Sequence, residues 1–202
     1  ISATATIIEP PAGLKVYDSS VNEGAGTISF RVVRDDSEGS ASFDYTLASG
    51  TATVGTDVTG TTSGTVSFAD GEEAKLVTLN VTNDSVFEGE ENFTIALSNL
   101  VDLTLDSASD AQATGTFFDD GNGGGATNDD RPAFSVNDVS VNEADSSLTF
   151  TVTKTGSVAT GLTSRVYYSL EDGTATVGED YQNKTGWLSF GATETSKTVT
   201  IT

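Results

Sequence analysis

The sequence predicts an all-β protein, namely tandem immunoglobulin-like antiparallel β-sandwiches of which the second copy is truncated. Two observations predict this class. Short runs alternate apolar and polar residues at a period of two, as half-buried strands do, and turn residues separate them every 8–12 residues. The chain also repeats itself over most of its 202 residues. With 21 Gly, 3 Pro and many Thr, Ser and Val residues, the composition favours short strands and turns over helices.

The internal repeat is carried by several motifs. Gly50–Asp57 (GTATVGTD) returns as Gly173–Asp180 (GTATVGED), and the triplet Val21–Glu23 (VNE) returns at Val141–Glu143. The period is roughly 120 residues, which is far too long for a solenoid and suits whole domains in tandem. Each copy is therefore expected to form one sandwich.

The expected strands follow from the alternating runs. The first copy opens with the run LKVYDSSV, and its clearest alternation is TISFRVV, in which every second residue is apolar. The second copy repeats that run as SLTFTVT. We expect strands near 14–21, 26–34, 40–48, 63–68, 74–82, 92–98 and 112–118, and in the second copy near 133–141, 146–154, 163–170, 185–190 and 195–201.

The domain boundaries follow from the repeat and from one further match. Ser2–Glu9 (SATATIIE) resembles Gln112–Asp119 (QATGTFFD), the last strand of the first copy. The chain is thus expected to be a window from an array of at least three repeats, with the glycine-rich segment as a flexible linker. The predicted parts are 1–10, the closing strand of a preceding repeat; 11–120, the first repeat; 121–132, an acidic Gly-rich linker; and 133–202, the incomplete second repeat.

Charge and composition exclude several functions. The chain has 30 Asp and Glu against 9 Lys and Arg, a net charge of -21, which repels nucleic acids and anionic membranes. No apolar run is long enough to cross a membrane. The chain contains no Cys and no His, so disulfides, thiolate chemistry and the commonest general base are absent. We expect neither nucleic-acid binding nor direct membrane insertion.

One acidic stretch is the candidate binding region. Residues 83–93 (NDSVFEGEENF) carry four carboxylates between two predicted strands. Like charges this close repel unless a cation neutralises them, and calcium prefers several carboxylate oxygens at flexible geometry. The alternative is a solvated acidic turn. Glu90 alternates away from Asp84, Glu88 and Glu91 and is expected to be solvated.

These motifs together resemble the Calx-β domain family. The matching residues are Val21–Glu23, Gly50–Asp57, Ser63–Phe68, Asp84–Phe93 and Phe117–Asp120. The family occurs in pairs in the cytoplasmic loop of sodium/calcium exchangers and in long arrays in bacterial surface proteins. The resemblance implies a β-sandwich whose acidic loops meet at one end and bind Ca²⁺.

The resemblance also implies a set of calcium ligands. In the first copy they are Glu23, Asp57, Asp84, Glu88, Glu91, Asp119 and Asp120, and in the second copy Glu143 and Asp180. Asn83 and Gly121 stand where the richest family sites carry Asp, and Val58 replaces the usual Tyr. These departures favour one or two ions over a cluster of four.

Two other motifs have simpler explanations. The glycines of GTATVG suit turn geometry, and a phosphate would be repelled by the net charge. Trp187 with Tyr167 and Tyr168 suggests a sugar platform, but aromatic residues on alternating strands are more often core residues or cross-strand pairs.

The leading functional hypothesis is a non-catalytic, calcium-stiffened spacer repeat of a long extracellular bacterial adhesin or fibre at the cell surface. Its partners would be neighbouring repeats or copies of itself, with Ile1–Glu9 adding as a strand to another domain. The alternative is a regulatory calcium sensor in an exchanger-like membrane protein. A glycosidase using two of the clustered carboxylates is the third option, and it needs one carboxyl group of raised pKa in a concave apolar pocket.

Overall fold

The computed structural model describes residues 10–105 and 107–202, so the predictions made for residues 1–9 lie outside the described residues. The chain forms two compact units, one comprising residues up to 83 with 89–128, the other comprising 84–88 with 129–202. Strands dominate both, and the only helical turns in the described part are the short 3-10 segments η1 (Glu23–Ala25) and η2 (Ala108–Ala111). The predicted all-β class is confirmed. No helix within the described residues is long and apolar enough to cross a membrane.

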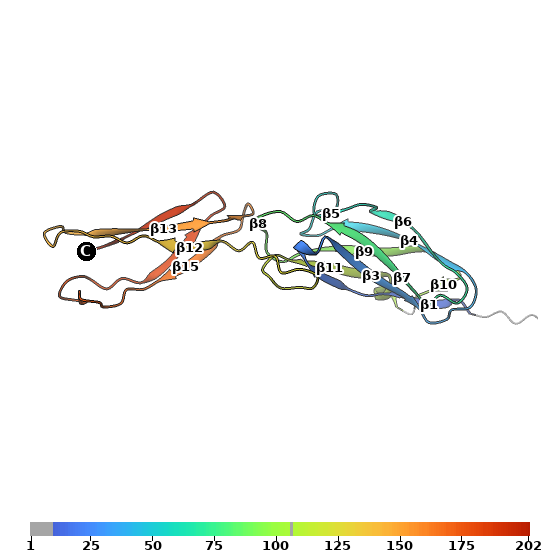
Figure 1. Cartoon of the computed structure of the whole chain (residues 1–202). Helices are drawn as coiled ribbons and strands as arrows, with labels where there is room; N and C mark the ends of the chain where they lie inside the picture. The colour runs from blue at the N-terminus through green and yellow to red at the C-terminus, as the bar shows by residue number, and fades with distance from the viewer. Residues whose placement is uncertain (1–9, 106) are drawn as a thin grey trace, which may run out of the picture. The chain divides into compact units, whose positions relative to one another are not determined.

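The first unit is a sandwich of two five-stranded sheets (Figure 1). The first sheet has the order β10 (Leu103–Thr104), β1 (Ala12–Val16), β3 (Thr27–Arg34), β7 (Ala74–Val81) and β5 (Val58–Thr59). The second has the order β2 (Ser19–Asn22), β11 (Gln112–Phe118), β9 (Glu91–Val101), β4 (Ala41–Ser49) and β6 (Ser63–Phe68).

The core between these sheets is built from the inward members of the alternating runs. Phe30 on β3 meets Phe93 on β9 edge to face, with ring centroids 5.7 Å apart, and Phe93 lies 5.4 Å from Phe117 on β11. All three rings are buried. Each buried Phe contributes about 1.5–3 kcal/mol relative to an exposed one, so this aromatic centre is a main source of stability.

The predicted strand 14–21 is wrong in one respect, because the structure divides it into β1 and β2. β1 pairs with β3 in the first sheet, whereas β2 pairs in parallel with β11 in the second. The backbone crosses from one sheet to the other at Tyr17 and Asp18. Asp18 accepts a hydrogen bond from the Thr114 amide on β11 at 2.7 Å, which holds the crossover against the second sheet.

The second unit contains a three-stranded and a two-stranded sheet. The first is β12 (Ala133–Val136), β13 (Leu148–Thr155) and β17 (Ser196–Ile201), and the second is β15 (Ser164–Tyr168) and β16 (Gly186–Phe190). Two short strands, β8 (Val86–Phe87) and β14 (Ser157–Val158), pair in parallel within the same unit. Residues 84–88 therefore group with the second unit, although the sequence places them in the first repeat.

Each unit contains one buried cationic side chain that donates hydrogen bonds to loop carbonyls, at the same position in the repeat. Arg34 is 4% exposed and its guanidinium donates to the carbonyls of five residues, while Lys154 is 3% exposed and its ammonium donates to Gly191 and Ala192. Both cations stand at equivalent places in the repeat. The carbonyls replace water around each buried charge, which is the condition for burying it.

Beside each buried cation lies an equivalent ion pair, Glu72–Lys75 in the first copy and Glu194–Lys197 in the second. The hydrogen bond donated by Lys75 and then that from the Ala69 amide lower the pKa of Glu72 below its usual 4.5. Lys197 and the Gly191 amide lower the pKa of Glu194 in the same way. When folding lowers the pKa of a carboxyl group, that group stabilises the folded state at any pH above its pKa in the unfolded chain. The stabilisation is lost as the pH falls through the pKa of the group in the folded state.

We therefore expect Glu72→Gln to lower the melting temperature of the first unit at pH 7 and to weaken its dependence on pH below about 4.5. Thermal melts followed by circular dichroism from pH 3 to pH 7 measure this. Glu73→Gln is the control, because Glu73 is an exposed neighbour on the same turn. Equal pH profiles for the two variants would contradict the role given to Glu72.

The glycine-rich segment differs from the predicted flexible linker. Residues 121–128 belong to the first unit and lie against the end of β2. The Asn22 amide donates to the Gly124 carbonyl at 2.9 Å, and a Cβ on Gly123, whose φ is +83°, would come within 2.6 Å of the Asn22 nitrogen. Glycine is needed at these positions because the backbone comes too close to β2 for a side chain, and because glycine adopts positive φ angles easily. Composition alone cannot distinguish these two uses of glycine.

Candidate functional site

The candidate site lies at the end of the first sandwich where β2 and β11 stop together. These strands run in parallel with Asn22 opposite Phe118, so the next residues, Glu23 and Asp119, emerge at the same edge. Glu23 is 7% exposed and Asp119 is 2% exposed. Buried carboxylates are rare unless a partner compensates the charge. Both were predicted as ligands, and the parallel register places them side by side.

Two further predicted residues of the first unit reach this end. Glu91 opens β9 opposite Phe117, next to the end of β11. Asp57 precedes β5, and its carbonyl accepts a hydrogen bond from Thr82 just beyond β7 at 2.9 Å. Val81 in turn bonds to Gly26, the residue that follows η1 and Glu23. The sheet register thus brings Glu23, Asp57, Glu91 and Asp119 to one end of the sandwich.

Asp57 and Asp180 hold the same turn in both copies. The Asp57 carboxylate accepts a hydrogen bond from the Thr53 amide at 2.6 Å, and the Asp180 carboxylate accepts one from the Thr176 amide at 2.8 Å. The repeated GTATVG motif is therefore a turn closed by its own aspartate, which agrees with the structural interpretation of its glycines. A carboxylate offers about four lone pairs, so this role leaves acceptor capacity for a cation.

The remaining first-copy ligands lie on less regular segments. Asp120 accepts hydrogen bonds from the amide and side chain of Asn122. Asp84 is exposed and accepts a hydrogen bond from the Val86 amide at 2.7 Å, and Glu88 is half-buried. Both belong to the segment 84–88 that groups with the second unit. The structure of the first unit by itself therefore positions five of the seven predicted ligands.

Within residues 10–105 and 107–202, no three Asp or Glu side chains converge closely enough to form a metal-binding group. The assignment of metal ligands consequently stays a prediction. The donor chemistry fits calcium all the same, because the candidates are carboxylates on turns and the chain has no His or Cys. Oxygen ligands at flexible geometry suit Ca²⁺, whereas zinc prefers nitrogen and sulfur.

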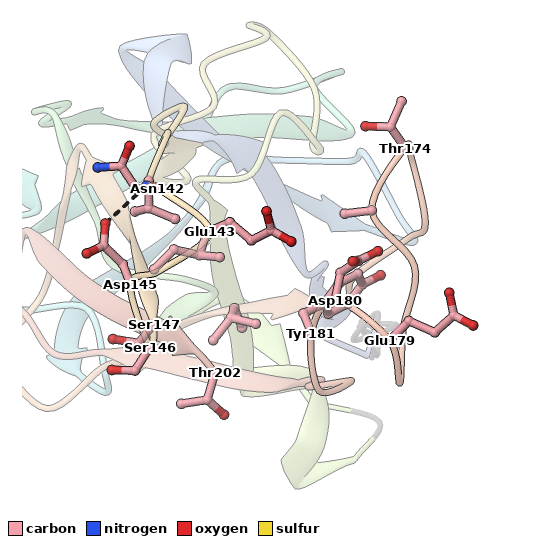
Figure 2. A pocket seen from close by; sticks show the side chains of 14 residues that line it. Asn142, Glu143, Asp145, Ser146, Ser147, Thr174, Glu179, Asp180, Tyr181 and Thr202 are labelled. Atoms are coloured by element: carbon pink, nitrogen blue, oxygen red, sulfur yellow. Dashed lines mark hydrogen bonds between the residues drawn. The ribbon is translucent and has the colours of Figure 1, made fainter.

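The equivalent end of the second unit is hollow. A cavity of about 510 Å³ is lined by Glu143 and Asp180 from two different loops, with Asp145 and Glu179 also on its wall (Figure 2). Glu143 and Asp180 are both exposed here, in contrast to the buried Glu23. Asp145 accepts a hydrogen bond from the Asn142 amide at 3.0 Å, shown as the dashed line in Figure 2. Among the second-copy acids, the sequence predicted only Glu143 and Asp180.

Sequence reasoning also missed polar residues that shape the two ends. Asn22 is fully buried and binds the segment 121–128, and the Asn128 side chain donates to Asn83. In the second copy Asp172 accepts hydrogen bonds from the Val177 amide and the Tyr181 hydroxyl. The bond to Asp172 raises the pKa of Tyr181. The only signal in the sequence was the repeated VNE triplet, which drew attention to its glutamate.

Comparison with known proteins supports the family resemblance. The profile of the Calx-beta domain matches residues 9–121 and 126–202. Sodium/calcium exchanger 1 from Bos taurus is 29% identical over 198 residues, and sodium/calcium exchanger 2 from Homo sapiens is 31% identical over 196 residues. Each alignment covers 89% of this chain and 20% of the exchanger. The chain thus spans about a fifth of the length of these relatives.

Solved structures give similar matches. The crystal structure of CBD12 from CALX1.2 is 28% identical with a TM-score of 0.49, covering 93% of this chain and 75% of that one. The calcium binding domain CBD12 of CALX1.1 is 26% identical, also with a TM-score of 0.49, covering 93% and 74%. The apo-form Calx CBD1 domain is 31% identical with a TM-score of 0.48, covering 54% and 96%.

Proposed function

The chain belongs to the Calx-beta domain family, and from this premise we propose that it is a non-catalytic calcium-binding module. The observation that carries the proposal is the pair of carboxylates at the end of the first sandwich, Glu23 and Asp119. They are adjacent by register and nearly inaccessible to water. In a chain of net charge -21, a divalent cation bound at this end would be attracted by both carboxylates.

The ligands would come from one end of the first unit. Glu23, Asp57, Glu91, Asp119 and Asp120 lie on turns or strand ends there, whereas Asp84 and Glu88 stay predicted ligands on the segment 84–88, which groups with the second unit. Bound calcium supplies positive charge that neutralises these loops and ties them to each other. The carboxylates serve as ligands and stabilise the domain end, and no bond-breaking step is assigned to them.

We expect calcium to stabilise the first unit. A ligand that binds only the folded state adds RT ln(1 + [L]/Kd), which is about 2.7 kcal/mol at a hundredfold excess over Kd. For a domain of this size, that shifts the melting temperature upward by roughly 10 °C or more. Isothermal titration calorimetry with CaCl₂ measures the dissociation constant. Thermal melts in EDTA and in calcium measure the shift in melting temperature.

Matched variants locate the effect. Asp119→Asn and Glu91→Gln are expected to reduce the calcium-dependent rise in melting temperature. Glu90→Gln is the control, because Glu90 precedes Glu91 on the same loop and is exposed. An absence of binding heat together with identical melts in EDTA and calcium would overturn the calcium proposal. A rise that Glu90→Gln reduces as much as Glu91→Gln would overturn the ligand assignment.

For the biological setting, we propose a spacer repeat of a long extracellular bacterial surface adhesin or fibre, stiffened by Ca²⁺ at its domain ends. Two observations support this setting. The glycine-rich segment 121–128 is held against the first unit, as a spacer of fixed geometry requires. Ser2–Glu9 also resembles β11 in sequence, which suggests more than two repeats.

A second setting is favoured by the relatives. The alignments with sodium/calcium exchangers cover both copies, which suits a pair of regulatory calcium-sensor domains in a membrane protein. The sequence of the full gene separates the two settings. Many copies of the repeat after a secretion signal support the spacer. Two copies between transmembrane helices support the sensor.

A further inference from the structure

The sequence contains one asparagine followed directly by glycine, the pair Asn122–Gly123 in the segment 121–128. An asparagine side chain can react with the main-chain nitrogen of the residue that follows it, and a side chain on that residue obstructs the reaction. Glycine has no Cβ and leaves its nitrogen open to attack. Whether this pair reacts in the folded protein depends on how the fold holds the two residues.

The attacking group of the pair is accessible. Asn122 and Gly123 are both exposed to solvent. The amides on either side of Gly123 in this segment are engaged, since Gly121 donates to the Asn128 carbonyl at 2.8 Å and Asn122 donates to the Asp120 carboxylate at 3.1 Å. Within residues 10–105 and 107–202, the Gly123 amide donates no hydrogen bond. Attack by this nitrogen therefore breaks no hydrogen bond that the fold has made.

The asparagine under attack is held in place. The side-chain Nδ2 of Asn122 donates to the Asp120 carboxylate at 2.8 Å, and this carboxylate also accepts from the Asn122 main-chain amide. The main-chain carbonyl of Asn122 accepts a hydrogen bond from Nδ2 of Asn22 at 2.9 Å. The side-chain amide is thus kept close to its own backbone. Holding reacting groups near each other lowers the entropic cost of bringing them together.

We propose that Asn122 is a site of spontaneous deamidation in the folded protein. The Gly123 nitrogen attacks Cγ of Asn122 and loses its proton, a C–N bond forms, and Nδ2 takes up a proton and leaves as ammonia. Water then opens the succinimide ring. Opening at Cγ gives aspartate, and opening at the former main-chain carbonyl gives isoaspartate. Water is the only co-reactant, and the reaction does not depend on the calcium proposal.

Each product changes the contacts of this segment. Aspartate at position 122 lacks the Nδ2 donor and places a second carboxylate beside Asp120, and these like charges repel. In isoaspartate the main chain runs through Cβ and Cγ and is one carbon longer, while the former carbonyl becomes a free carboxylate off the main chain. That carbonyl is an acceptor for Asn22, so isoaspartate should weaken the attachment of residues 121–128 to β2.

Peptide mapping by mass spectrometry measures the reaction. Residues 1–202 are incubated at mildly alkaline pH, in a buffer in which circular dichroism shows the strands folded. Asn137 is the internal control, because it is also exposed but is followed by Asp138, which carries a side chain. We expect deamidation at Asn122 to be about tenfold faster than at Asn137, or more. Equal rates at the two asparagines would overturn the proposal.

A parallel incubation in urea separates the effect of the fold from that of the sequence. Because the pair is exposed and the Gly123 nitrogen is free within the described residues, we expect Asn122 to react about as fast in the folded chain as in the unfolded one. An Asn122 that reacts in urea but stays intact in the folded chain would show that the fold protects it, and this result would also overturn the proposal.

Hydrogen–deuterium exchange on the aged protein tests the consequence for the segment. The amides of Gly121 and Asn128 should exchange faster in the aged chain than in an Asn122→Gln chain aged in parallel. Glutamine keeps the amide but would have to close a larger ring, so this variant should stay unmodified at position 122. Equal exchange in the two aged samples would contradict the weakened attachment of residues 121–128.

Discussion

Replacing Arg34 with methionine is expected to lower the free energy of unfolding of the first unit by about 3 kcal/mol or more. The guanidinium is buried and donates to the carbonyl of Glu72 at 2.6 Å, of Ser37 at 2.7 Å and of Ala69 at 2.9 Å. Further carbonyls, those of Gly39 and Glu38, accept from the same group. Methionine keeps most of the apolar volume but leaves these carbonyls without their donor.

The effect is expected to be large because the guanidinium joins two loops at once. Residues 37–39 follow β3 and residues 69–72 follow β6, and Arg34 donates to carbonyls of both loops. Two further hydrogen bonds join these loops, from the Gly71 amide to the Ser37 carbonyl and from the Gly39 amide to the Asp70 carboxylate. The ring of Phe68 lies 5.1 Å from the guanidinium and adds a cation–π contact. Losing several charged hydrogen bonds lowers stability more than losing one typical neutral bond, which is worth about 1 kcal/mol.

Chemical denaturation in urea and thermal melting measure the loss, which corresponds to roughly 10 °C or more in melting temperature for a domain of this size. Arg31→Met is the matched control, because Arg31 lies on the same strand with its side chain exposed. It is expected to change stability by no more than about 0.5 kcal/mol. A variant Arg34→Met as stable as Arg31→Met would show that water satisfies the carbonyls equally well.

The fold could be predicted from the sequence because alternation and repetition are local signals. β6 (Ser63–Phe68) and β11 (Gln112–Phe118) begin and end at the predicted residues. The split between β1 and β2 could not be predicted, because one alternating run can serve two sheets and only the partners decide where it crosses. The strand predicted over 133–141 ends at Val136, since the residues after it have no ladder partner among the described residues.

The candidate site was predictable in part. The resemblance identified Glu23 and Asp119, and the register of β2 on β11 places them together as buried neighbours. It did not identify the neighbouring hydrogen bonds between Asn22 and residues 121–128, because composition indicated flexibility in that segment. Sequence patterns also could not predict that Asp84 and Glu88 group with the second unit, because this grouping depends on the pairing of β8 with β14.

Replacing Asn22 with leucine is the second large expected effect, a loss of about 3 kcal/mol in the stability of the first unit. Asn22 is fully buried and uses its whole hydrogen-bonding capacity. Its Nδ2 donates to the carbonyls of Asn122 and Asn128, each at 2.9 Å. Its Oδ1 accepts from the amides of Gly24 at 3.0 Å and Asn128 at 3.2 Å. Leucine has similar volume and satisfies none of these four groups.

The loss is expected to be concentrated in one segment. Because Asn22 holds residues 122 and 128 at once, its replacement should release the segment 121–128 from the end of β2, next to Glu23 and Asp119. Hydrogen–deuterium exchange should therefore quicken at the amides of Gly121 and Asn128 more than in the β3–β7 ladder. Urea denaturation gives the accompanying change in the free energy of unfolding.

The chain offers its own control for this variant. Asn142 occupies the same place in the repeated VNE triplet, but its side chain is exposed, so Asn142→Leu is expected to change stability by less than about 0.5 kcal/mol. If the two substitutions lower the free energy of unfolding equally, the hydrogen bonds of Asn22 are not what holds the segment 121–128. If exchange in residues 121–128 stays slow in Asn22→Leu, the contacts of Gly123 and Gly125 with β2 and η1 hold the segment by themselves. A selective loss in Asn22→Leu would make this asparagine the residue that turns a glycine-rich stretch into a fixed part of the first domain.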